Sequence, residues 1–189
     1  RNRLATGEVV GGERPLLTSA LPAISFNSSV EIYLNNEEIQ IYTPRSLNSH
    51  TDTDAFIYFR NANVLYIGDH LFLNRYPIVD LDNGGDIEGY FSNIKYIIDN
   101  QDSETLIVPG HGTFDPQPVR AITMSELTEQ YELLMTTIQI VKSAINNGKS
   151  LVEIIDEGLP PHYSFYNEQP RYVSEESWLT TLFNYYQTE

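Results

Sequence analysis

Short stretches of alternating apolar and polar residues fill the first half of the chain and predict β-strands. Between residues 30 and 41 the alternation continues on either side of Asn35-Asn36, a pair typical of a tight turn, so we expect a β-hairpin there. Further short strands are expected at 55–59, at 64–67 and, after a gap, at 106–108. The intervening segment 68–85, which contains a proline and paired glycines, is expected to be a loop.

The second half of the chain changes to the three-and-four spacing of amphipathic helices. Asp86 is a candidate N-cap in front of an apolar stripe, and two later Ser/Thr-x-x-Glu patterns are typical of capping boxes. Asn-Gly and Gly-Leu-Pro-Pro sequences predict where helices stop. Helix starts are therefore expected at Asp86, Thr123, Ser150 and Ser174, and helix ends at Asn147 and Gly158.

Strands followed by strand–helix alternation predict an α/β sandwich. A chain of 189 residues with 41% apolar residues is long enough for one domain with a sizeable core. We expect a single domain over 1–189, in which 1–29 is an irregular lead-in, 30–112 carries strands and loops, and 113–189 is mainly helical.

The charge of the chain excludes some partners. Its 26 acidic and 11 basic residues give a formal net charge of −15, which repels nucleic-acid phosphates and anionic membrane surfaces. No apolar stretch is long enough to span a membrane. There is no cysteine, so any metal must be bound by imidazole and carboxylate groups, a donor set that suits zinc, iron or manganese.

Three short segments place a metal-capable side chain at the end of an expected strand. They contain His50, Asp69 and His111, and glycines beside the last two allow a sharp turn and a close approach to a ligand. Each segment alone is better explained as an ordinary turn or a structural histidine than as a metal ligand. The order and flanking residues of all three together carry more information. The informative pieces are His50-Thr51-Asp52-Thr53-Asp54, Asn63-Val64-Leu65-Tyr66-Ile67-Gly68-Asp69, Tyr76-Pro77-Ile78-Val79-Asp80, Gly84-Gly85 and Val108-Pro109-Gly110-His111-Gly112.

In this order the pieces resemble the later motifs of the metallo-β-lactamase superfamily, and the Tyr-Pro and Gly-Gly pieces resemble its branch of hydrolases related to the quinoprotein relay system. The resemblance implies the αβ/βα sandwich fold and a site with two metal ions, most simply zinc. It implies that His50 and His111 each bind one ion and that Asp69 bridges both.

Other residues near these motifs have less specific implications. Candidates for a supporting hydrogen bond or a substrate wall are Asp52, Asp54, His70, Arg75 and Tyr76. Phe72 is a further candidate for the substrate wall. A solvated turn is the better interpretation for His70, and a surface salt bridge explains Arg75 as well as a substrate contact does. His162, between two prolines and Tyr163, is interpreted as structural.

One defining motif of the superfamily, His-x-His-x-Asp-His, is absent, because the chain has only four well-separated histidines. That motif supplies the remaining ligands and the aspartate that orients the attacking water. We therefore expect an N-terminally truncated member that holds zinc weakly or not at all and is inactive alone, with no catalytic residue of its own. The parent is expected to be a hydrolase of a small ester, lactone, thioester or amide.

Other hypotheses remain open. The chain is alternatively a non-catalytic α/β interaction module that retains the loops as structure, or a redox or nuclease member of the superfamily. The acidic surface disfavours a nuclease. Surfaces exposed by truncation predict self-association. A soluble protein is expected, periplasmic or secreted in the case of the parent, but the sequence does not fix the compartment.

Overall fold

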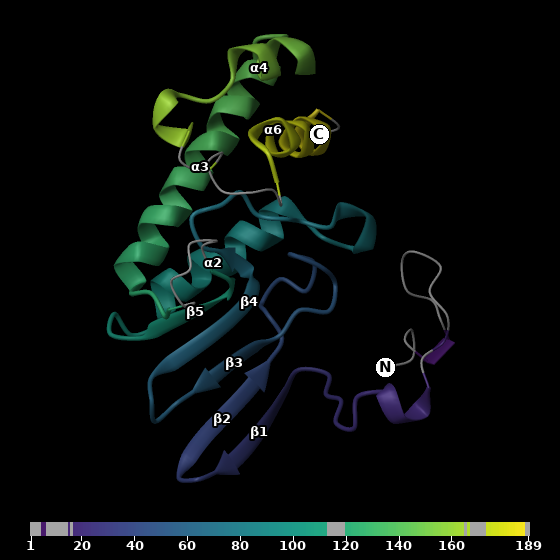
Figure 1. Cartoon of the computed structure of the whole chain (residues 1–189), viewed down its shortest axis with the longest axis vertical. Helices are drawn as coiled ribbons and strands as arrows, with labels where there is room; N and C mark the ends of the chain where they lie inside the picture. The colour runs from purple at the N-terminus through teal and green to yellow at the C-terminus, as the bar shows by residue number, and fades with distance from the viewer. Residues whose placement is uncertain are drawn as a thin grey trace.

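The computed structural model describes residues 5–6, 15, 17–112, 120–164, 166 and 173–187. These residues form a five-stranded sheet whose strands lie side by side in chain order (Figure 1). The strands are β1 (Ser29–Leu34), β2 (Glu37–Tyr42), β3 (Phe56–Phe59), β4 (Val64–Phe72) and β5 (Leu106–His111). The first four are antiparallel to their neighbours, and β5 runs parallel to β4.

The predicted hairpin is present as β1 and β2. Its turn residues Asn35 and Asn36 have φ values of 52° and 60°, the left-handed conformation that a two-residue turn between twisted strands requires. Asparagine tolerates this conformation better than most residues. The turn sets the register in which Val30 pairs with Ile41, so their side chains share one face of the sheet.

The segment from 68 to 72 is strand rather than loop, so this part of the sequence prediction is wrong. β4 continues through Gly68, Asp69 and His70 to Phe72, with shifts in its register against β5. β5 likewise runs on to His111 instead of ending at residue 108. Gly68 has a φ of +55°, so it can interrupt the regular pleat without ending the strand.

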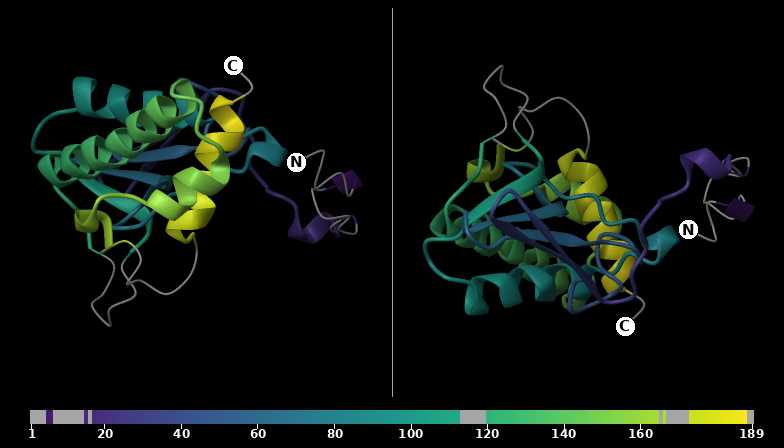
Figure 2. Two further views of the ribbon diagram at one scale, coloured as in Figure 1. Left: turned by 90° about the horizontal axis from the view of Figure 1, so that it is seen from above. Right: turned by 90° about the horizontal axis from the view of Figure 1, so that it is seen from below.

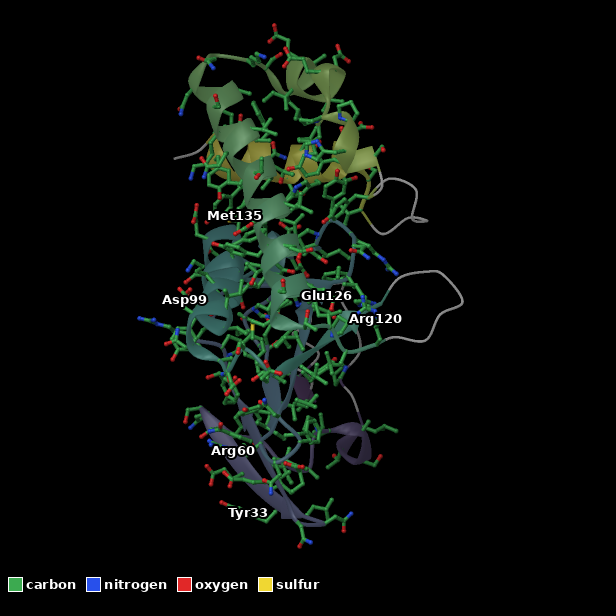
Figure 3. The ribbon with its side chains drawn as sticks, turned by 90° about the vertical axis from the view of Figure 1, so that its left-hand side faces the viewer. Tyr33, Arg60, Asp99, Arg120, Glu126 and Met135 are labelled. Carbon is green, nitrogen blue, oxygen red and sulfur yellow. The ribbon has the colours of Figure 1, made fainter. Side chains whose placement is uncertain are left out.

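The helices begin where the sequence predicts. They are α2 (Ile87–Asn100), α3 (Met124–Asn146), α4 (Leu151–Glu157) and α6 (Glu175–Tyr186). Asp86 accepts a hydrogen bond from the N–H of Gly89, and both predicted capping boxes are formed. At the start of α3, Arg120 also pairs with the capping residue Glu126 (Figure 3). Short 3-10 turns occur at Thr18–Ala20, Leu81–Asn83 and Pro161–Tyr163.

The core lies between the helices and one face of the sheet. Seen from above, α3, α4 and α6 lie in front of the strands, and α2 is the crossover between the parallel strands β4 and β5 (Figure 2). Leu65, Ile67 and Ile107 on this covered face are fully buried, as is Trp178 of α6. Leu182 and Tyr186 of the same helix are also buried.

The opposite face of the sheet carries two complete rows of apolar side chains, which we call the open sheet face. The pairing of the strands defines the first row as Val30, Ile41, Ile57, Tyr66 and Val108, and the second as Ile32, Ile39, Phe59, Val64 and Leu106. None of these residues belongs to the buried core cluster. Leu106 is 41% exposed and the other nine are half-buried, so helices cover only one side of the sheet.

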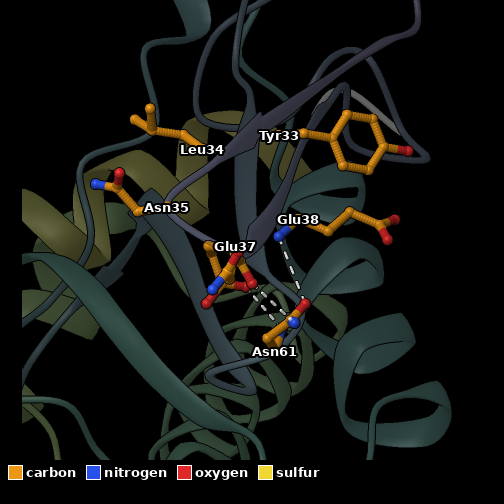
Figure 4. Close-up of a pocket in the computed structure, with 7 residues that line it drawn as sticks. Tyr33, Leu34, Asn35, Glu37, Glu38 and Asn61 are labelled. Atoms are coloured by element: carbon orange, nitrogen blue, oxygen red, sulfur yellow. Dashed lines mark hydrogen bonds between the residues drawn. The ribbon is translucent and has the colours of Figure 1, made fainter.

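The N-terminal segment and the tip of the hairpin add little to the core. The predicted irregular lead-in over 1–29 lies partly outside the described residues, and within it the turn Thr18–Ala20 buries no side chain. The tip of the hairpin, with Asn61 bonded to Asn36 and Glu37, borders a shallow hollow of about 520 Å³ (Figure 4). None of the three candidate metal ligands lines that hollow. Within the described residues, no helix combines the length and apolar character that crossing a membrane demands.

Candidate metal centre

The structure brings His50, Asp69 and His111 together at one end of the sheet. His50 lies in the connection between β2 and β3, Asp69 lies in β4, and His111 is the last residue of β5. The Asp69 carboxylate lies between the two imidazoles. One of its oxygens is 3.6 Å from Nε2 of His50, and the other is 3.3 Å from Nε2 of His111.

These two separations fit ligands that share an ion. Two donor atoms about 2.1 Å from a tetrahedral zinc ion lie about 3.4 Å from each other. The observed 3.6 Å and 3.3 Å are close to that value, and both exceed the usual range for an N–H···O hydrogen bond. The Asp69 and His111 side chains are 34% and 38% exposed, so the place between them is open to solvent. Imidazole nitrogen and carboxylate oxygen are donors that zinc accepts.

The three side chains form two pairs that share Asp69. In the part of the chain that the structure describes, no three His, Cys, Asp or Glu side chains gather so that together they could hold one ion. Each pair therefore offers two donors, one of them common to both. Structural zinc sites use four protein ligands and catalytic sites three, so neither pair is a complete site.

Asp54 supports His50 from the side away from Asp69. Its carboxylate lies 3.0 Å from Nδ1 of His50 and accepts a hydrogen bond from the N–H of Thr51 at 2.8 Å. Burial raises the pKa of Asp54, but these hydrogen bonds outweigh it and the net pKa is lowered. Burial lowers the pKa of His50, but the bond to Asp54 and neighbouring carboxylates outweigh it and the net pKa is raised. The contact directs Nε2 of His50 toward Asp69.

Asp69 packs against the backbone of β5. A Cβ atom placed on Gly110 would lie 2.3 Å from Oδ1 of Asp69 and 2.6 Å from the carbonyl carbon of Gly68. Only glycine therefore allows the two strands to approach this closely while the carboxylate keeps its place between the histidines. Gly110 precedes His111 in the sequence motif, and the atom that it accommodates is Oδ1 of Asp69.

His111 is held by the end of β4. Its ring stacks on the ring of Phe72, with centroids 4.8 Å apart and planes 12° from parallel. Its carbonyl oxygen accepts a hydrogen bond of 2.9 Å from the N–H of Leu73, and the buried guanidinium of Arg75 donates to the carbonyl oxygen of Gly112. The backbone on both sides of the imidazole is thus fixed.

His70 is buried, so its interpretation as a solvated turn is wrong. Its side chain is packed edge-on against Phe56 and stacked on Tyr90, and Asn93 lies 3.3 Å from its Nε2. Only 1% of His70 is exposed, and burial lowers its pKa to about 4, which makes it neutral at pH 7. Its contact with Tyr90 of α2 places it on the covered side of the sheet, because the register shift at Gly68 reverses the alternation set by Leu65 and Ile67.

The predicted substrate wall is also wrong for its main members. Tyr76 is fully buried in the core, stacked with Tyr166 and Trp178. Arg75 and Phe72 are 6% and 1% exposed, so neither offers a surface to a substrate. They are buried because the chain after β4 packs against the helices, where Asn74 bonds Gln130 of α3 and Tyr76 stacks on Trp178 of α6.

Two of the predicted residues, Asp52 and His162, are exposed. The Cβ of Asp52 borders Gly84, and the carboxylate of Asp54 contacts His50. His162 is exposed in the turn before residue 164 and lies on the ring of Tyr163, as a structural residue would.

Two buried amide side chains were missed by the sequence analysis. Asn93 of α2 bonds both backbone groups of Ser46, at the base of the segment that carries His50. Gln130 of α3 bonds the backbone of Phe72 and Asn74. The available signal was a polar residue at a position that helical spacing places on the buried side.

Sequence comparisons give no match, either to models of protein families or to curated proteins. Solved structures do match in fold. A stereoselective inverting sec-alkylsulfatase from Pseudomonas sp. superposes with a TM-score of 0.58 at 14% identity, covering 88% of this chain and 27% of its own. The B3 metallo-β-lactamase BLEG-1 gives a TM-score of 0.51 at 19% identity, covering 68% of this chain and 58% of its own.

This chain therefore has the metallo-β-lactamase fold, as the order of its motifs implied. It spans about a quarter of the length of the sulfatase and somewhat over half of that of the β-lactamase. At these identities the likeness establishes the fold alone.

Proposed function

We propose that this chain contributes His50, Asp69 and His111 to a two-ion metal centre of a hydrolase. The observation that carries the proposal is the Asp69 carboxylate, whose two oxygens each face a different imidazole at 3.6 Å and 3.3 Å. The nitrogen and oxygen donors favour zinc. A bound pair of ions supplies Lewis acidity and an activated water for hydrolysis.

The residues of this chain have distinct tasks in such a centre. The negative charge of Asp69 would lower the repulsion between two bound cations. Asp54 accepts the Nδ1–H of His50, which leaves Nε2 free to act as a ligand and keeps the ring from turning. Gly110 leaves room for the carboxylate, and the exposure of Asp69 and His111 leaves room for a substrate.

The residues that the structure describes do not supply all the ligands that the proposed centre needs. His70 is buried away from Asp69, and His162 lies in a separate turn, so neither completes a pair. We therefore propose that this chain alone binds zinc weakly and does not catalyse hydrolysis. The substrate class proposed for the complete enzyme is a small ester, lactone, thioester or amide.

A second candidate function is a non-catalytic interaction module. The open sheet face favours it, because two rows of apolar side chains without a helical cover are typical of a surface that packs on another protein. We propose that copies of this chain associate weakly through this face. Both candidate functions are compatible with the open sheet face. They differ in whether the chain binds metal.

Metal titration of the chain tests the proposal. We expect zinc to bind to the wild type with the weak affinity of two-donor sites and to be lost in Asp69→Ala, which removes the shared ligand. His111→Ala should lose about half of the bound zinc, because one of two pairs is broken. His162→Ala is the matched control and should bind like the wild type. Equal zinc binding by Asp69→Ala and the wild type, measured by calorimetry and elemental analysis, would rule the centre out.

A further inference from the structure

The ring of Phe72 forms the floor of the candidate centre. It stacks on His111 at 4.8 Å and lies 6.4 Å from the ring of His50, so one buried side chain borders both imidazoles. Only 1% of Phe72 is exposed, whereas 38% of the His111 side chain is exposed. The orientation of the more exposed ring therefore depends on the position of the buried one.

Gln130 fixes Phe72 from the neighbouring layer. Its Nε2 donates to the carbonyl oxygen of Phe72 at 2.7 Å, and its Oε1 accepts from the N–H of Asn74 at 2.9 Å. The nitrogen and the oxygen of one side-chain amide are thus bonded to the backbone at the end of β4 and in the turn that follows. Asn74 has a φ of 58°, a conformation that few residues other than glycine adopt, so this turn needs external support. Gln130 itself is 6% exposed, on the face of α3 that packs toward the sheet.

We propose that Gln130 is a positioning residue for the metal centre, which acts through the Phe72 ring to hold the plane of the His111 imidazole. This inference rests on the proposed function of His50, Asp69 and His111 as ligands. This series of contacts runs from the amide of Gln130 to the backbone of Phe72, and from the Phe72 ring to His111. A ligand held in its working orientation loses less freedom when it binds an ion, so affinity rises.

Substitutions along this series of contacts test the role proposed for Gln130. Gln130→Met keeps the size of the side chain and removes both hydrogen bonds, and Gln130→Glu removes only the donor to Phe72. Phe72→Leu keeps an apolar side chain and removes the flat ring. The matched control is Thr137→Val, two helical turns farther along α3. Thr137 is fully buried, and its hydroxyl donates to the carbonyl oxygen of Leu134 and accepts from the indole N–H of Trp178. The control therefore also loses buried hydrogen bonds, one within α3 and one to α6.

The measurement is a titration with Co²⁺, whose visible absorption reports the geometry of its ligands. We expect Gln130→Met and Phe72→Leu to bind Co²⁺ about tenfold more weakly than the wild type, with an altered spectrum. Gln130→Glu should change in the same direction by less. Thr137→Val should bind like the wild type although its melting temperature falls. Wild-type binding by Gln130→Met, or equal weakening by Thr137→Val, overturns the inference.

A second readout separates this inference from the proposed function. In the metal-free chain, stacking on Phe72 shifts the carbon-bound imidazole protons of His111 in the NMR spectrum. We expect these signals to move toward those of an unstacked histidine in Phe72→Leu and, in part, in Gln130→Met and Gln130→Glu. If the wild type binds no Co²⁺, the proposed centre fails, and the His111 signals still decide the role of Gln130. Unchanged His111 signals in all three variants would overturn it.

Discussion

Both faces of the sheet carry apolar side chains around β4 and β5, but the described helices cover only one of them. On the covered face, Leu65, Ile67 and Ile107 are fully buried beneath the helices. On the open sheet face, residues of the same types, such as Ile41 and Ile57, stay half-exposed. The difference shows that apolar character at alternate positions identifies a strand, whereas stability comes from the side that another layer covers.

The largest effect is expected for a matched pair of truncations on the two faces. Ile107→Ala should lower the free energy of unfolding by about 2–5 kcal/mol, because it leaves a cavity in a closed core. Ile41→Ala should cost about 1 kcal/mol, because its side chain already contacts water. Urea denaturation of both variants measures the difference. Equal losses would mean that the open sheet face is covered in solution.

A smaller effect is expected where the two parallel strands meet at the candidate centre. Gly110→Ala should cost about 1–3 kcal/mol, because the added methyl group overlaps the backbone of Gly68, which cannot move aside freely. It should also displace the Asp69 carboxylate and weaken Co²⁺ binding. Thermal denaturation and Co²⁺ titration check the two effects. A variant with wild-type stability would show that β4 and β5 lie farther apart than described.

In the helical layer that covers one face of the sheet, Arg120 and Thr123 bond Glu126 at the start of α3. The hydrogen bond from Arg120 and those from Thr123 lower the pKa of Glu126 to about 2, so the bonded carboxylate stabilises the fold at pH values above its ordinary pKa. That contribution should disappear as the pH falls from about 4.5 to about 2. Glu126 is partly exposed, so we expect Glu126→Gln to cost at most about 1 kcal/mol at pH 7.

Unfolding by urea at several pH values measures this contribution. The stability difference between the wild type and Glu126→Gln should shrink with acid, because only the wild type loses a charge there. A constant difference between pH 7 and pH 2 would contradict a role for the ionised carboxylate.

The smallest effect on stability is expected at the edge of the open sheet face. Ile32→Lys in β1 should change the free energy of unfolding by about 0.5 kcal/mol, as is usual for surface positions. It should nevertheless reduce any self-association, because a charge on an edge strand opposes pairing with another sheet. Sedimentation velocity over a range of concentrations measures this. Association that persists in Ile32→Lys would place the contact elsewhere.

Local signals in the sequence predicted the elements well. The paired asparagines at 35–36 and the Thr123–Glu126 and Ser150–Glu153 capping boxes were predicted correctly, because each depends on neighbours within a few residues. The prediction that β4 ends at residue 67 was wrong, because a proline and paired glycines farther along led to a loop assignment for the whole of 68–85. The strand continues through Gly68 because β5 pairs with β4 both before and after this residue.

The sequence pointed to the three candidate ligands but did not predict the burial and contacts of the residues around them. The motif order pointed to His50, Asp69 and His111, which the structure places together, although their role as ligands stays a prediction. The burial of Arg75 and Tyr76 depends on how the chain after β4 packs against the helices, which local sequence patterns do not predict. The contact of Gln130 with Phe72 joins residues far apart in sequence, so it required the tertiary structure.

The crossover from β4 through α2 to β5 has a consequence for how the molecule reaches its folded state. The β1–β2 hairpin joins strands that are adjacent in sequence, whereas the contact between Asp69 and His111 joins strands separated by the whole of α2. Long-range parallel pairing of this kind is slow compared with hairpin formation. We therefore expect His111 to reach Asp69 late in folding, and a metal probe added during refolding would time this step.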